Sequence, residues 1–298
     1  MKKILISILA LVAVTACNKE EIVDANPGDA IAFGNAFVDN ATKADYSSTD
    51  ITSFNVYGTV NDVNIYNATP VTKGTADYGA VWNCDVKQYW IDGAAYKFAA
   101  VVDATSVNVN TTTKMPESLV YDATSQKDML YKYEERTGKP TGQNSIVAFT
   151  FTHLLSKAFF TVTNNIQDSK YTYSITDVKV TNAYQNGTYT VTGDNGTWGG
   201  TNANATSFAN IESVANGTPK TNAEMLLIPT ATVGVSFKVH LYIDGTEVTS
   251  YDFAKAEVAT LAANSVYNFN VTLSLTDEIQ FTVTKQPKWT TPNENVSI

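Results

Sequence analysis

Alternation of apolar and polar residues with a period of two recurs along this chain. In the stretch FKVHLYI, residues 237–243, every second residue is apolar, which gives a strand one buried face. Asp244-Gly245 follows, a pair that a two-residue type I′ hairpin turn favours because both central residues need a positive φ. Residues 267–275 and 279–283 alternate in the same way. The pattern predicts an all-β fold of antiparallel sandwiches.

Turn signals divide the chain between these stretches. The further dipeptides expected to form turns are Asp92-Gly93, Asn186-Gly187, Asn195-Gly196 and Asn216-Gly217. Long helical periodicity is missing, and only short helical insertions are expected, near Gln126 to Tyr133. The loop-rich segment 134–145 precedes a long apolar run and places a domain division near residue 155.

The first residues have the layout of a bacterial export signal. A basic start precedes the apolar run 4–14, which is shorter than the ~20 residues that a membrane-spanning helix needs. Small residues lead into Cys17, so the site resembles a lipobox, with a signal peptide over 1–16 and a lipid on Cys17. The following residues, NKEE, resemble the export signal of surface lipoproteins of the Bacteroidetes. The alternative is a plain secretory signal with an incidental cysteine.

Composition argues against several classes of function. The net charge is −9 and Arg136 is the single arginine, so we expect no binding to nucleic acid. With Cys17 lipidated, Cys84 has no partner for a disulfide. The two histidines, His153 and His240, cannot build a multi-histidine metal site, and His153 is expected to be a hydrogen-bonded structural residue. No catalytic motif is present, so we expect no enzyme activity, no cofactor and no metal.

Several segments, in this order and spacing, resemble the fimbrillin family of the Bacteroidales, which comprises pilins and minor fimbrial subunits. They are the lipobox with its acidic sequel, IAFGNAFVDNATKA, VWNCDVKQYWIDGAAYKFAAVV, FTFTHLLSKAFFTVTN, AEMLLIPT, LAANSVYNFNVTLSL and TVTKQPKW. The resemblance implies two tandem transthyretin-like β-sandwich domains, over 44–155 and 156–298. Before them lies the lipidated segment 17–43, which would carry a removable first strand.

The resemblance also implies a route of assembly. A protease removes the lipidated segment with the first strand, and the vacated groove accepts a strand from the next subunit, which is a form of β-augmentation. The first strand is expected within residues 30–38, with Ile31, Phe33 and Phe37 filling the groove. Relatives commonly carry Thr-Arg-Ala at the processing site. Here the site reads Thr42-Lys43-Ala44, so cleavage before Ala44 needs a lysine-specific or trypsin-like enzyme.

The candidate donor strands are residues 267–275 and 278–289, the second with Ile279, Phe281 and Val283. Their alternative role is that of two core strands of the second domain.

The expected function is that of a structural or adhesive subunit of a cell-surface fimbria. Its expected partners are other fimbrial subunits, the outer membrane through the lipid on Cys17, and a receptor on a host or bacterial surface. The alternative is a free-standing surface lipoprotein that binds glycans or host proteins. For that alternative Trp198, in the turn-rich GDNGTWGGTN, is the tryptophan expected to be exposed for ligand contact.

Overall fold

The structure, a computed structural model, describes residues 30–38, 51–74, 82–139, 146–166, 168, 170–207, 211–214, 219–222, 224–274 and 279–286. The expected all-β fold is confirmed. The strands in chain order are β1 (Ala32–Val38), β2 (Ser53–Val60), β3 (Val63–Lys73), β4 (Trp82–Cys84), β5 (Ala95–Val102), β6 (Ser106–Val109), β7 (Pro116–Asp122), β8 (Leu130–Thr137), β9 (Ile146–His153), β10 (Ser156–Asn164), β11 (Tyr171–Thr192), β12 (Asn195–Ser207), β13 (Ile211–Val214), β14 (Lys220–Thr221), β15 (Met225–Leu227), β16 (Thr232–Ile243), β17 (Thr246–Thr260), β18 (Ser265–Leu273) and β19 (Gln280–Gln286).

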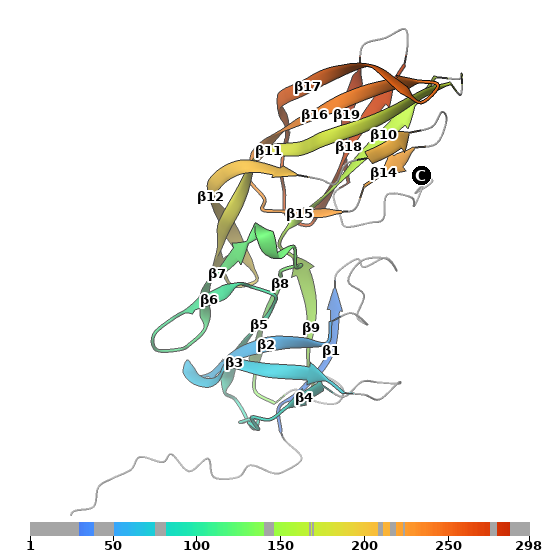
Figure 1. Ribbon diagram of the computed structural model, residues 1–298. Helices are drawn as coiled ribbons and strands as arrows, with labels where there is room; N and C mark the ends of the chain where they lie inside the picture. Colours follow the sequence, from blue (N-terminus) through green and yellow to red (C-terminus); the bar gives the residue numbers. More distant parts are fainter. Residues whose placement is uncertain are drawn as a thin grey trace, which may run out of the picture.

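The first sheet forms one lobe of the molecule (Figure 1). Its strand order is β1-β9-β8-β5-β2-β3-β4. Every pair is antiparallel except β1 with β9. One face of this sheet encloses an aromatic core that includes Phe54, Phe98 and Phe149. The alternation of buried and exposed positions along β9 shows why the sequence pattern predicts a strand here.

Two sheets enclose the core of the second lobe. One has the order β14-β10-β18-β19, with β15 also paired to β10. The other has the order β17-β16-β11-β7-β6, with β12 and β13 also paired to β11. Phe160 and Phe269 come from the first of these sheets, while Ile175 and Phe237 come from the second. Apolar residues of both sheets therefore pack face to face, which is the arrangement of a β-sandwich.

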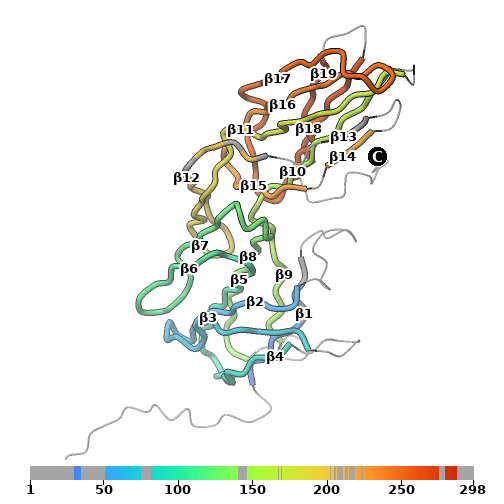
Figure 2. Tube along the Cα trace, viewed as in Figure 1, coloured from blue at the N-terminus to red at the C-terminus, as the bar shows by residue number. Residues whose placement is uncertain are grey.

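The long strand β11 runs from the second lobe into the region between the lobes (Figure 2). Its first half pairs with β16 and its second half pairs with β7. A third core of buried residues fills this region, with Tyr57 from β2, Leu119 from β7 and Val266 from β18 among its members. The two lobes are thus joined by a continuous strand and by shared apolar packing.

The chain passes from the first sheet to the second at Leu154 and Leu155, between β9 and β10. The strands β6 and β7, which precede this point, pair with β11 and not with the first sheet. The domain division near residue 155 therefore stays a prediction, because the hydrogen bonds between β7 and β11 join residues from both sides of it.

The expected type I′ turn at Asp244-Gly245 is present, with φ of 49° and 79°, and it joins β16 to β17. The prediction of a turn at Asn186-Gly187 is wrong, because β11 continues through both residues. A Cβ on Gly187 would lie 2.8 Å from Trp198 and 2.9 Å from Ile228. This glycine is therefore required by close packing in a strand and not by a turn.

Two other local expectations are corrected. The turn expected at Asn195-Gly196 lies at Gly193 and Asp194, where Gly193 supplies the positive φ of 60°, and β12 already begins at Asn195. The helical piece expected near residues 126–133 is a single 3₁₀ turn, η2 (Ala123–Ser125), capped by the Asp122 side chain. Residues 130–133 belong to β8, which pairs with β5 and β9, and Leu130 and Tyr131 are buried on opposite faces of the sheet. A turn forms at Asp92-Gly93, and Asn216-Gly217 lies outside the described residues.

Candidate functional site

The first strand, β1, lies at one edge of the first sheet and is held from two sides. It pairs in parallel with β9, in register from Ala32 to Gly34, and a register shift separates this part from Phe37. At its start, the Ile31 N–H donates to the Gln88 carbonyl at 2.8 Å, and Ala30 bridges to Tyr89. Residues 88–89 follow β4, the strand at the opposite edge. The sheet therefore curls round on itself, and β1 closes the seam.

Phe33 projects into the middle of the aromatic core of this lobe. Its exposed fraction is 4%, and that of Ile31 is 6%. The Phe33 ring lies 5.4 Å from Tyr66 of β3 and 6.2 Å from Phe149 of β9, measured between ring centroids. It also packs edge-on against Phe54 and Phe98, at 6.4 and 6.2 Å. One side chain of β1 thus contacts four strands of the sheet.

Burial of Phe33 and of Ile31, the residue just before β1, supplies most of the apolar contact that the structure describes for this segment. Full burial of a large apolar side chain is worth about 1.5–3 kcal/mol, so Ile31 and Phe33 together contribute about 3–6 kcal/mol. A parallel pair is slightly less stable per residue than an antiparallel one, and the register shift interrupts the ladder. The buried Ile31 and Phe33 side chains therefore hold this segment together with the backbone ladder, and its loss would expose an aromatic-lined groove.

The structure places the other N-terminal site residues only in part. The Phe37 backbone belongs to β1 and pairs with Thr150; its side chain lies outside the described residues. Cys17, Lys43 and Ala44 also lie outside the described residues. Lipidation and processing at these positions stay predictions.

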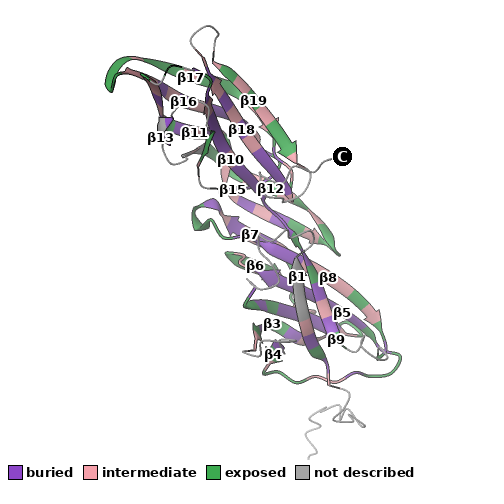
Figure 3. Cartoon of the chain, turned by 90° about the vertical axis from the view of Figure 1, so that its right-hand side faces the viewer, coloured by how far each residue is buried: buried purple, intermediate pink, exposed green. Residues whose placement is uncertain are grey.

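The candidate donor strands differ in accessibility (Figure 3). β18 lies between β10 and β19 and is buried at alternate positions, whereas β19 is the edge strand of its sheet. Ile279, Phe281 and Val283 are partly buried against the core of the second lobe. The Phe281 ring lies 5.5 Å from that of Phe253 and 6.4 Å from that of Phe269. In this structure β19 therefore acts as a core strand of its own lobe, and it is the strand that can leave with the smaller loss.

The expected exposure of Trp198 is not found. The residue is half-buried in β12, its Nε1–H donates to the Leu154 carbonyl at 2.8 Å, and its ring lies 5.5 Å from that of Tyr189. It packs over Gly187 and joins the core between the lobes. Neighbouring strands supply this contact, which the turn-rich local sequence does not reveal.

The histidines take part in structural hydrogen bonds. His153 is fully buried, and its Nδ1 lies 2.7 Å from Asp128 Oδ2, as expected for a structural histidine. Burial raises the pKa of the Asp128 carboxyl, although its hydrogen bond with His153 acts in the opposite direction. Nearby, the buried Lys157 pairs with the Glu224 carboxylate at 3.1 Å. Sequence reasoning missed this polar cluster because its members lie far apart in the sequence.

His240 lies on the polar face of β16, where it contacts Thr176 at 2.9 Å and Glu247 at 2.9 Å. Within the described ranges, no group of three histidine, cysteine, aspartate or glutamate side chains is placed to hold a metal ion. Nor does the described part of the chain contain a helix long and apolar enough to cross a membrane. Neither observation adds a second candidate site to the one at β1.

The fold thus defines an all-β, two-lobed protein with accessible strands at the edges of its sheets, a geometry suited to association by strand pairing. Residues 35–287 match the family model described as fimbrillin-like, and the chain belongs to this family. Residues 1–18 match the model of a prokaryotic membrane lipoprotein lipid attachment site, as expected from the sequence around Cys17. No curated protein matches the chain.

Solved structures from Bacteroides species share the fold. A fimbrial protein from Bacteroides vulgatus is 11% identical, with a TM-score of 0.61, over 87% of this chain and 98% of that one. A candidate cell adhesion protein from Bacteroides uniformis is 17% identical, with a TM-score of 0.53, over 89% and 99%. Another from Bacteroides ovatus is 15% identical, with a TM-score of 0.51, over 86% and 95%. At these identities the likeness concerns the fold alone.

Proposed function

We propose that this protein is a structural or adhesive subunit of a cell-surface fimbria, assembled by donor-strand exchange after proteolysis. The observation that carries the proposal is the position of β1. It closes the first sheet from an edge, and Phe33 occupies the middle of the core that it closes. An edge strand that fills a groove with alternate apolar side chains can be replaced by another strand with the same alternation.

The lipid attachment motif supports delivery to a membrane before assembly. Lipid chains on Cys17 would hold the precursor at the outer membrane, facing the outside of the cell. Cleavage between Lys43 and Ala44 would then remove the lipid and β1 together, because β1 ends at Val38. Other fimbrial subunits are the partners that would supply the replacing strand, and a surface receptor would be the target of an adhesive role.

Controlled cleavage tests this proposal. The unlipidated precursor, with Cys17→Ser, is treated with a lysine-specific protease, its new N-terminus is determined by mass spectrometry, and polymers are sought by electron microscopy. We expect a chain that starts at Ala44 and forms filaments, while Lys43→Gln keeps its first strand and stays monomeric. A chain that starts at Ala44 and stays monomeric would contradict strand exchange and favour the free-standing surface lipoprotein.

A further inference from the structure

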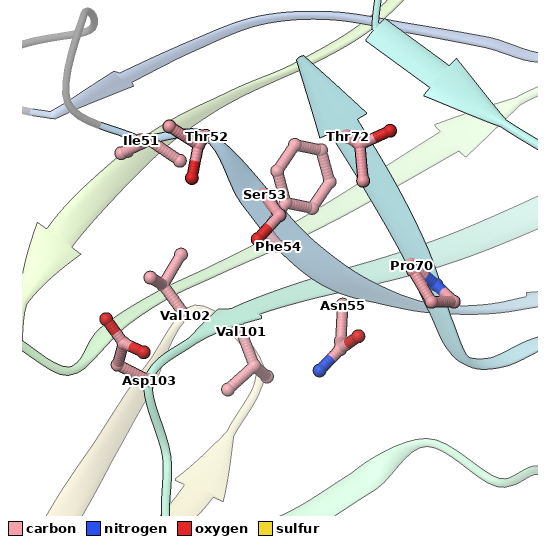
Figure 4. Close-up of a pocket in the computed structure, with 10 residues that line it drawn as sticks. All are labelled: Ile51, Thr52, Ser53, Phe54, Asn55, Pro70, Thr72, Val101, Val102 and Asp103. Atoms are coloured by element: carbon pink, nitrogen blue, oxygen red, sulfur yellow. The ribbon is translucent and has the colours of Figure 1, made fainter.

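The first lobe carries a cavity of about 290 Å³ (Figure 4). Three neighbouring strands, β5, β2 and β3, build it. Asn55 of β2 lies opposite Pro70 of β3 and Val101 of β5, and Ser53 lies opposite Thr72. Residues two apart on a strand point to the same side, so these side chains lie on one side of the sheet, where Val101 also packs in the core between the lobes. The strands supply most of the lining, and Ile51, Thr52 and Asp103, next to the strand ends, complete it.

Polar groups without a protein partner surround the cavity. In the described part of the chain, no other protein group forms a hydrogen bond with the side chains of Thr52, Ser53, Asn55 and Thr72. Asp103 adds a carboxylate at one end, where the backbone has a positive φ of 52°. The cavity thus presents both donors and acceptors to a ligand.

The charges of the cavity exclude several ligand classes. Asp103 is the single carboxylate that lines the cavity, and it already lies 3.7 Å from the Lys127 ammonium. One carboxylate provides too few anionic ligands for Ca²⁺. The lining itself includes neither lysine nor arginine, so no cationic group lines the cavity to bind an anion. An apolar ligand would leave the hydroxyl and amide groups buried without partners. The class that fits is a neutral ligand rich in hydroxyl groups.

We propose that this cavity binds one neutral sugar residue of a surface glycan. Sugar hydroxyls both donate and accept, so they match Ser53, Asn55 and the Asp103 carboxylate, while Pro70 and Val101 contact the apolar ring atoms. The volume lies at the lower end of small-molecule sites and suits a single ring. A ligand of this size with polar contacts binds with a Kd on the order of 1 mM.

Such an affinity becomes effective when many copies of the site act together. In a filament, each subunit would present one cavity, and multivalent binding can exceed the single-site affinity by about 10²–10⁴-fold. This part of the inference rests on the proposed fimbrial function. The site itself does not, because it is already formed in the monomer.

The test is therefore made on the monomeric precursor with Cys17→Ser, labelled with ¹⁵N. Methyl glycosides of glucose, galactose, mannose, fucose and N-acetylglucosamine are titrated, with N-acetylneuraminic acid, inorganic phosphate and Ca²⁺ as charged probes. We expect at least one neutral glycoside to shift amide signals of β2, β3 and β5 in a saturable way. The double variant Ser53→Ala/Asn55→Ala should weaken that binding by about tenfold or more.

The matched control is Ser250→Ala/Thr282→Ala, at exposed strand positions of the other lobe, which should bind as the unsubstituted chain does. Absence of saturable shifts up to about 50 mM glycoside would overturn the proposal, since that exceeds the expected Kd many times. Saturable shifts at these strands with phosphate or Ca²⁺ alone would also overturn it, as would binding that the double variant leaves unchanged. Failure of filament formation would leave the monomer titration unaffected, so the two proposals fail separately.

Discussion

Replacement of Phe33 by alanine tests whether β1 is an integral part of the first lobe. The ring is 4% exposed and contacts aromatic rings from β2, β3, β5 and β9. A buried Phe→Ala substitution costs about 3–5 kcal/mol, which includes the cavity that remains. We expect Phe33→Ala to fall in the upper part of this range, because each aromatic pair adds about 0.5–1.5 kcal/mol beyond burial.

Urea denaturation followed by tryptophan fluorescence measures this loss. Trp82 and Trp90 lie in the same core as Phe33, and the Trp82 ring is 5.2 Å from that of Phe54. With a urea m-value of about 2 kcal/mol/M, a loss of 3–5 kcal/mol lowers the midpoint by about 1.5–2.5 M. The transition that these tryptophans report should therefore move by an easily measured amount.

Ala32→Ser is the matched control, since Ala32 belongs to the same strand and is exposed. It should leave the midpoint unchanged within about 0.5 kcal/mol. If Phe33→Ala were as mild as Ala32→Ser, the ring would not pack in the core and β1 would not close the sheet. The reasoning that assigns β1 a replaceable place in this lobe would then be refuted.

Three further substitutions or titrations check separate parts of the fold. Phe281→Ala should cost about 1.5–3 kcal/mol in urea denaturation, less than a fully buried phenylalanine, because its ring is partly buried; a neutral effect would show that β19 is not docked. Gly187→Ala should destabilise by about 1–3 kcal/mol through the clash with its neighbours, whereas Gly199→Ala, which has room, should be neutral or stabilising. Burial raises the pKa of Tyr121 to about 12 and also raises that of Tyr66. Their stabilising contribution is present below pH 10 and is lost as the pH rises toward 12, so ultraviolet titration should show Tyr121 ionising near pH 12 and not near 10.

The sequence predicts strands well where a single face is buried. β16 and its turn at Asp244-Gly245 follow directly from alternation and from the need for positive φ at both turn residues. The same reasoning is wrong at Asn186-Gly187, where glycine is required because any side chain would clash with Trp198. A dipeptide signal cannot distinguish these two uses of glycine, because the second depends on a neighbouring strand. The hairpin at Asn61-Asp62, with φ of 48° and 62°, lacks glycine and was therefore missed.

At the candidate site, the sequence predicts the first strand itself but not the strands and residues that it pairs with. Alternation and the family resemblance indicate apolar residues Ile31 and Phe33 on one face of the first strand. Its partner, β9, lies more than a hundred residues further along the chain, and such a non-local pairing leaves no local signal. The hydrogen bond from the Ile31 N–H to the Gln88 carbonyl also joins residues far apart in the sequence, and no local pattern predicts it.

The balance of side-chain burial favours β19 over β18 as the donated strand. A strand that leaves one sheet edge and joins another exchanges its backbone hydrogen bonds about one for one, so apolar burial decides the outcome. Withdrawal of β18 would expose Phe269, which is fully buried. Phe281 of β19 is only partly buried in its own lobe. It would become more buried in the groove of the first lobe of the next subunit, where Phe33 is 4% exposed.

A reversible lock on β19 tests this assignment. Asn270 of β18 and Thr282 of β19 are antiparallel partners, and directly opposed positions of this kind lie within the Cα separation that a disulfide spans. In the variant Asn270→Cys/Thr282→Cys, we expect the oxidised precursor to be cleaved after Lys43 yet to stay monomeric. Reduction should then restore filaments. Filaments of equal yield from the oxidised variant would show that β19 stays paired with β18 during assembly. Another edge strand would then have to be the donor.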